Sequence, residues 1–455
     1  MKTIAIFQSG ALALSLLTGG VMAAVSPQEA AQLGTTLTPL GAEKAGNANG
    51  TIPAWNGGLK PGAAHDQNGF LEDPFANDKV SMVITSANAE QYKDKLSAGQ
   101  LAMFKRYPDT YKIQVYPTRR SAAAPQEVYD AVKKSALSTE SVNEGNGLKN
   151  FEQSHYYAFP IPKSGIEVVW NHLTRYKGPN YIQRQVQAAP QVDGSYIPVV
   201  IEMKLGSPWL MKDVDPQKSS NILYYVTQTI VSPARMAGTV TLAHETLDQI
   251  KEPRLAWAYN AGQRRVRRAP QVAYDGPANA ADGMQVVDQI DMYNGAPDRY
   301  DWKLIGKKEM YIPYNNYKLW SPKVTLDDII KPGHINQDLA RYELHRVWEV
   351  EATLKSSQRH IYAKRRMYFD EDTWQLALVD QYDGRGQLWR VSEGHAVNDY
   401  EQGKATYAAV GVYDLIAGRY VVSNLQNASK QGTDYSYQPN MSDFIPAALR
   451  NSGVR

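Results

Sequence analysis

Four histidines lie near residues that could share chemistry with them. His155 and His172 have Tyr156, Trp170 and Arg175 close by in the sequence, so either imidazole could act as a general base. His345 and His360 could bind a metal together with nearby carboxylates, and these are Glu343, Glu349 and Glu351. Neither pair has a recurring ligand spacing. The simpler interpretation is hydrogen-bonded histidine on the polar face of a strand.

Carboxylates offer two further candidates. Asp370-Glu371-Asp372 resembles a calcium-binding turn, but an EF-hand loop needs wider spacing and a bidentate glutamate. The three residues separate two alternating segments, which predicts a solvated hairpin turn. Glu167 and Glu202 could be proposed as a glycosidase pair, but such a pair is defined by a separation that the sequence does not give.

Motifs of common enzymes are absent from the 455 residues. There is no phosphate-binding glycine loop, no G-x-S-x-G and no H-E-x-x-H. Zero cysteine excludes disulfides, thiolate zinc sites, cysteine nucleophiles and a lipidated N-terminal cysteine. A net charge of +3, from 49 basic and 46 acidic residues, gives no case for nucleic-acid binding. We therefore predict a protein that is not an enzyme and has no cofactor, metal site or nucleic-acid partner.

The densest run of charge is Arg264-Arg265-Val266-Arg267-Arg268. It could contact an anionic lipid headgroup or an acidic partner, and it could equally be the solvated end of a strand. We take Arg264, Arg265, Arg267 and Arg268 as candidates for headgroup or partner contact.

The first 23 residues have the pattern of a secretory signal peptide. Lys2 precedes an apolar run at 11–17, and Val21-Met22-Ala23 places small residues at a cleavage site. The run is too short to span a bilayer. We therefore expect cleavage after Ala23 and an unlipidated product in the periplasm of a Gram-negative cell.

Residues 24–78 are predicted to form an extended N-terminal arm. Ser26-Pro27-Gln28-Glu29 is a capping box that should start a short helix ending at Gly34. Beyond it the arm is rich in Gly, Pro, Asn and Ala, and its apolar residues should pack on the main body. The main domain, 79–455, should begin with helices over 88–106 and 125–137.

After about residue 156 the pattern becomes that of strands. The candidates are 197–203, 222–231, 238–245, 254–259, 302–311, 342–355, 360–369, 374–382, 387–391, 405–414 and 419–425. Short turns such as Asp383-Gly384-Arg385-Gly386 separate several of them. The predicted fold is mainly β (α+β), a large curved antiparallel sheet or half-barrel covered by a few helices.

The clearest alternation runs over 342–355, which predicts a strand with one apolar and one solvated face. The apolar face could line a groove for a lipid-like ligand, with Trp257 as a further aromatic wall. The candidate ligand-binding residues are Trp257, Leu344, Trp348, Val350 and Leu354. The alternative is that covering helices fill this groove as an ordinary core.

Several segments resemble a proteobacterial periplasmic family known as domain of unknown function 1329. They are Leu37 to Asn47, Phe159-Pro160-Ile161-Pro162, Trp170-Asn171-His172, Arg264 to Pro270, Tyr300 to Leu304, Arg341 to Trp348 and Asp380 to Asp383. The resemblance implies a fold similar to the lipoprotein carriers LolA and LolB, with a concave apolar face covered by helices. It also implies lipid-related transport beside a resistance-nodulation-division exporter or an outer-membrane protein.

We therefore expect a periplasmic carrier or chaperone for a lipid or other hydrophobic molecule, working with an envelope export system. One alternative is a transporter adaptor without a ligand cavity. The other is an enzyme that acts on envelope lipid or glycan through His172, which requires a carboxylate within hydrogen-bond reach of that side chain in a cleft.

Overall fold

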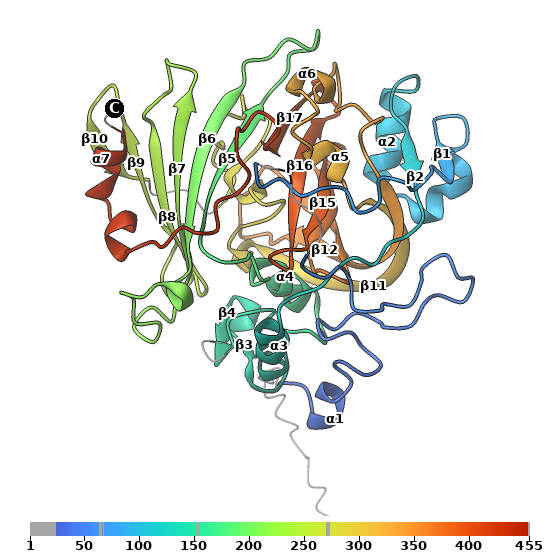
Figure 1. Cartoon of the computed structure of the whole chain (residues 1–455), viewed down its shortest axis with the longest axis horizontal. Coiled ribbons are helices and arrows are strands. Elements are labelled where there is room, and N and C mark those ends of the chain that lie inside the picture. The colour runs from blue at the N-terminus through green and yellow to red at the C-terminus, as the bar shows by residue number, and fades with distance from the viewer. Residues whose placement is uncertain (1–23, 63–65, 67, 152–153, 270–273, 454–455) are drawn as a thin grey trace, which may run out of the picture.

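The computed structural model describes residues 24–62, 66, 68–151, 154–269 and 274–453, so the predicted signal peptide lies outside the described residues. Its main feature is an open, curved sheet of 15 strands (Figure 1). The strand order is β1-β2-β12-β13-β14-β15-β16-β17-β5-β6-β7-β8-β9-β10, and β11 pairs with β12. Neighbouring strands run antiparallel, except for a single parallel pairing of β2 with β12. The predicted fold class is confirmed.

The strands of the large sheet follow most of the predicted segments. They are β1 Met82–Ile84, β2 Ile113–Val115, β5 Tyr181–Ala188, β6 Val199–Gly206, β7 Ile222–Ser232, β8 Val240–Thr246, β9 Leu255–Asn260, β10 Arg265–Arg268, β11 Tyr300–Pro313, β12 Tyr342–Leu354, β13 Lys364–Asp370, β14 Leu376–Tyr382, β15 Leu388–Asp399, β16 Lys404–Asp414 and β17 Arg419–Leu425. A separate hairpin pairs β3 Glu140–Val142 with β4 Gly147–Lys149.

The α-helices are short and lie mostly against the sheet. They are α1 Pro27–Ala30, α2 Ala98–Arg106, α3 Gln126–Ser138, α4 Gly165–Leu173, α5 Tyr317–Trp320, α6 Leu326–Ile329 and α7 Ala448–Gly453. The capping box at Ser26 is confirmed. Within the described part of the chain, no helix has both the length and the apolar character needed to cross a bilayer.

The single helix predicted over 88–106 is divided in two. A 3-10 helix, η1 Ala89–Lys95, ends at Leu96, where the backbone is extended. Ser97 then starts α2, because its hydroxyl accepts a hydrogen bond from the Gln100 amide at 3.0 Å. Apolar residues are spaced as in one helix on both sides of Ser97, but the cap at Ser97 starts a new helix there.

The sheet has two sections that meet at β17 and β5. Their pairing is limited to Val422 with Ala188 and Leu425 with Val186, with a register shift between them. In Figure 1 the green strands β5–β10 lie on one side of this junction, and the orange to red strands β12–β17 lie on the other. Helix α4, which the sequence did not predict, packs on β11 and β12.

The arm has isolated bridges but no strand among its described residues between α1 and β1, and it crosses the main body. Ile52 and Phe70 are buried in the same core cluster as Tyr342 and Leu344 of β12. Arg120 holds the arm by its backbone, because its guanidinium donates to four arm carbonyls, those of Glu43 at 2.7 Å, Lys44 at 3.2 Å, Pro53 at 3.3 Å and Ala45 at 3.5 Å. The division of the chain at residue 78 stays a prediction.

The second face of β12 differs from the prediction of a solvated surface. Glu343, His345 and Val347 are 0–1% exposed. Glu343 accepts hydrogen bonds from the side chains of Arg341 at 2.6 Å and Asn315 at 2.9 Å. The alternation marked the strand correctly. In the first half of the strand partner side chains satisfy the polar face, whereas Glu349 and Glu351 are partly exposed and Thr353 is exposed.

Candidate ligand pocket

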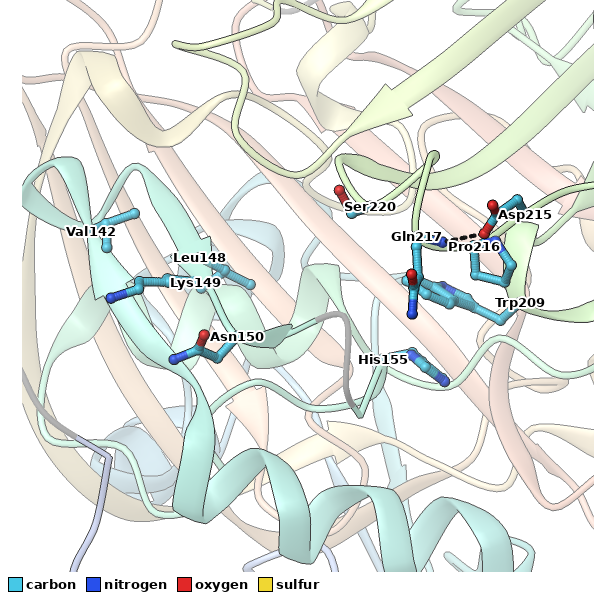
Figure 2. Close-up of a pocket in the computed structure, with 10 residues that line it drawn as sticks. All are labelled: Val142, Leu148, Lys149, Asn150, His155, Trp209, Asp215, Pro216, Gln217 and Ser220. Atoms are coloured by element: carbon cyan, nitrogen blue, oxygen red, sulfur yellow. Dashed lines mark hydrogen bonds between the residues drawn. The ribbon is translucent and has the colours of Figure 1, made fainter.

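An open pocket of about 980 Å³ lies between the β3–β4 hairpin and the segment that connects β6 to β7 (Figure 2). Its lining is mixed, with aromatic and aliphatic side chains next to polar ones at the rim. The lining residues are Val142, Leu148, Lys149, Asn150, His155, Trp209, Asp215, Pro216, Gln217 and Ser220. A volume of this size lies within the range of small-molecule sites.

The hairpin wall is held in place from two sides. Trp170 of α4 donates its indole N–H to the Gly145 carbonyl at 2.7 Å. Asn143 donates its amide to Asp248, which follows β8, at 2.9 Å. These bonds fix the turn between β3 and β4, and so fix Val142 and Leu148 at the pocket wall.

The opposite wall depends on Asn180, just before β5. Its side chain accepts from the Ser207 amide at 2.8 Å and donates to the Leu210 carbonyl at 3.2 Å. Trp209 lies between these two anchored residues and stacks on His155, with ring centroids 4.0 Å apart and ring planes 13° apart. In Figure 2 the pair lies on the side of the pocket opposite Val142 and Leu148.

A second, much smaller chamber of about 30 Å³ adjoins the pocket, since His155 and Trp209 line both. That volume is about the share of one water molecule. Arg175, Lys177 and Tyr224 line the chamber, together with Ser207 and other residues. The chamber therefore adds two cations to the end of a partly apolar pocket.

Asp291 pairs with both of these cations. It accepts from the guanidinium of Arg175 and from the ammonium of Lys177, the latter at 2.5 Å. Burial opposes ionisation of Asp291, but Arg175 and Lys177 outweigh it and hold the pKa well below its ordinary value. Burial, and next the neighbouring Arg175, lower the pKa of Lys177 to about 8. Arg175 and Lys177 carry two positive charges when both are protonated, and Asp291 supplies only one negative charge.

His172 does not offer the general base that the enzyme hypothesis needs. It is 0% exposed on α4, and both ring nitrogens are engaged by backbone groups. Its Nδ1 accepts from the Leu376 amide at 3.1 Å, and its Nε2 lies 3.0 Å from the Asp291 carbonyl. Burial lowers the pKa of His172 to about 3, so the ring is neutral and structural.

The ligand wall predicted from the sequence is divided among three clusters. Leu344 packs in the core that also holds Ile52 and Phe70 of the arm. Trp348, Val350 and Leu354 pack in the core that includes α4, and Trp257 packs near α7. None of these five side chains lines the pocket of Figure 2. Their role in ligand binding stays a prediction.

The charged candidates lie elsewhere. Arg264, Arg265, Arg267 and Arg268 are all exposed, in or next to β10, which is the terminal strand of the sheet. Glu167 lies on α4 and accepts from the Lys163 amide at 2.5 Å. Glu202 lies on β6 and pairs with Arg184 at 2.9 Å. The two carboxylates thus lie on different elements, and each is bonded to its own partner rather than facing the other.

The predicted solvated turn Asp370-Glu371-Asp372 is buried, at 2–4% exposure. Arg120 binds Asp372 through two hydrogen bonds of 2.6 and 2.9 Å. Arg346 binds Glu371 at 3.1 Å. These pairs belong to the same network as Glu343 and His345. The other predicted candidate, His360, lies 3.0 Å from Asp288, which also pairs with the buried Arg365.

The fold and the site define a large open-sheet β protein with a pocket beside one sheet section. The chain belongs to the family described as Protein of unknown function (DUF1329), which matches residues 83–450. This confirms the family resemblance seen in the sequence. An uncharacterized protein of Pseudomonas aeruginosa is 59% identical over 457 residues, and the match covers 100% of both chains.

Three solved structures are similar to parts of the chain. A candidate outer membrane lipoprotein-sorting protein domain from Vibrio parahaemolyticus is 13% identical, with a TM-score of 0.43, and the match covers 63% of this chain and 98% of that one. A DUF1329 family protein from Desulfovibrio piger is 15% identical, with a TM-score of 0.40 and coverage of 60% and 92%. A LolA superfamily protein from Nitrosomonas europaea is 11% identical, with a TM-score of 0.38 and coverage of 62% and 98%.

Proposed function

We propose that the protein is a periplasmic carrier or chaperone for a lipid or other hydrophobic molecule, held in the pocket beside the β3–β4 hairpin. The observation that carries this proposal is the open pocket of about 980 Å³ with its anchored aromatic wall. Trp209 and Leu148 supply apolar area, while Lys149 supplies charge at the rim. Apolar walls with a few placed polar groups are typical of sites for small hydrophobic ligands.

The leader-like residues 1–23 support the periplasmic location. An envelope exporter of the resistance-nodulation-division type is the partner that the family resemblance implies. The presence of the pocket argues against an adaptor without a ligand cavity. An enzyme that uses His172 as its base is also less supported, because both ring nitrogens of His172 are bonded to backbone groups.

The test is binding of N-phenyl-1-naphthylamine, a neutral apolar dye whose fluorescence rises in an apolar site. We expect the wild-type chain to bind it and Trp209→Ala to weaken binding about 30-fold. This corresponds to about 2 kcal/mol for the loss of a large part of an aromatic contact surface. Mass spectrometry of the protein under native conditions, after purification from periplasm, would identify the natural ligand.

Trp257→Ala is the matched control, because Trp257 is also partly buried and belongs to the wall predicted from the sequence. If the pocket is the site, this variant keeps wild-type affinity. Loss of binding in Trp257→Ala together with retention in Trp209→Ala would move the site to the predicted wall. A wild-type chain that binds no apolar probe would refute the carrier function itself.

A further inference from the structure

The buried network under the arm contains three side chains with the geometry of metal ligands. His345 of β12, Asp370 at the end of β13 and Asp372 in the following turn are 1%, 2% and 4% exposed. One ligand atom from each, the imidazole nitrogen and two carboxylate oxygens, lies within 4.8 Å of the other two. We propose that these three residues bind one divalent transition-metal ion of the zinc class.

Glu343 sets the orientation of the imidazole. Its Oε2 lies 3.0 Å from His345 Nε2 and also accepts from the Arg119 amide at 2.7 Å. Its Oε1 accepts from Arg341 and Asn315. Because Nε2 faces Glu343, Nδ1 is turned toward the two aspartates. A carboxylate bonded to the far nitrogen is the usual support of a metal-bound histidine.

The spacing is too wide for hydrogen bonds and leaves space for an ion between the three side chains. Nδ1 of His345 lies 3.9 Å from Asp370 Oδ1 and 4.0 Å from Asp372 Oδ2. Both distances exceed the reach of a hydrogen bond, so a proton on Nδ1 would be shared with neither oxygen. A tetrahedral ion about 2.1 Å from two ligand atoms holds them about 3.4 Å apart, so His345 and the aspartates would move about 0.5 Å closer when the ion binds.

Asp370 provides a second, independent observation. Its Oδ2 accepts from the hydroxyl of Thr373 at 2.6 Å and from the Thr373 amide at 3.1 Å. Its Oδ1, the atom that faces His345, has no hydrogen-bond partner among the described residues, although it is buried. A buried carboxylate oxygen without a partner is costly, and an ion at this point would satisfy it.

Ligand type and burial indicate the kind of ion and its role. Imidazole with carboxylate oxygens suits zinc and neighbouring divalent metals. The arm covers the site, since Arg120, which binds Asp372, also donates to the arm carbonyls. The ion would therefore be structural, bound as the arm closes over it, and the proposal is independent of the ligand pocket.

The test measures metal content and thermal stability. Wild-type protein purified without chelator should contain about one ion per chain by plasma mass spectrometry. Protein refolded with zinc should melt about 4 °C higher than protein refolded with chelator. Asp370→Asn keeps the shape of the side chain but weakens it as a ligand, so we expect the ion and the zinc response to be lost.

Asp380→Asn is the control, because Asp380 is equally buried but lies on β14 with Ser97 and Gly99 as its partners. This variant should keep the ion. Wild-type protein without bound metal and without a zinc response would overturn the proposal. So would Asp370→Asn with an unchanged or higher melting temperature in both buffers, because that result is expected when the substitution only removes a buried charge.

Discussion

Glu393 on β15 should make the protein less stable as the pH rises from about 4.5 to 7. The side chain is 0% exposed, and the phenol groups of Tyr111 and Tyr342 lie 2.8 and 3.3 Å from its two oxygens. Burial raises its pKa from the ordinary value of 4.5 to about 7, and the two tyrosine hydrogen bonds only partly oppose this.

The direction of this change in stability follows from proton binding. Between pH 4.5 and 7 the folded chain keeps a proton that the unfolded chain releases, so the free energy of unfolding falls as the pH rises. Over this interval of about 2.5 pH units, the loss amounts to about 3 kcal/mol for full titration. It is complete above pH 7, where the folded chain must hold an ionised buried carboxylate.

Glu393→Gln removes the titration and keeps the shape and an oxygen acceptor for Tyr111. Urea unfolding at pH 5 should give similar free energies for variant and wild type. At pH 8 the variant should be more stable, by up to about 3 kcal/mol. Glu90→Gln, at an exposed position, controls for the loss of one charge. An equal difference between Glu393→Gln and wild type at both pH values would refute the reasoning.

Two further predictions concern the arm and the arginine run. Gly41→Ala should lower the melting temperature by several degrees, because a Cβ there would lie 1.9 Å from the Pro160 carbonyl oxygen, at a backbone φ of +98°. Gly34→Ala, with φ +86° and open space around the new Cβ, should cost much less; equal losses measured by calorimetry would contradict this. Replacing Arg264, Arg265, Arg267 and Arg268 by serine should leave the melting temperature unchanged and weaken sedimentation with phosphatidylglycerol vesicles at low salt, since all four are exposed. Unchanged sedimentation would rule out headgroup contact.

Strand β12 shows what alternation can and cannot predict. Its period of two identified the strand and its apolar side. The prediction of a solvated polar side was wrong for the first half of the strand, because the residue types of Glu343 and His345 are the same whether water or a partner side chain satisfies them. The prediction of a solvated turn at Asp370 was wrong for the same reason. Its acidic residues look solvated until Arg120, about 250 positions earlier in the chain, is placed beside Asp372.

Among the elements that the sequence did not predict, α4 and β5 have unusual patterns. In α4 every residue except Ile166 is buried, so no polar face reveals the helical period. In β5 the buried positions include Gln183, Gln185 and Gln187, while Arg184 between them is exposed. The pocket could not be predicted either, since it depends on Trp209, between β6 and β7, stacking on His155, which precedes α4. The nearest signal was the aromatic character of both residues.

The attachment of the arm has a consequence for how the chain reaches its native state. Trp374 donates to the carbonyl of Leu40 at 2.7 Å, and Arg346 donates to that of Ala45 at 3.0 Å, across separations of 334 and 301 residues. A chain that emerges N-terminus first therefore presents the arm long before its binding surface exists. Contacts this distant in sequence slow folding. During that interval Ile52 and Phe70 are exposed, and a holding chaperone or a protease has time to reach them.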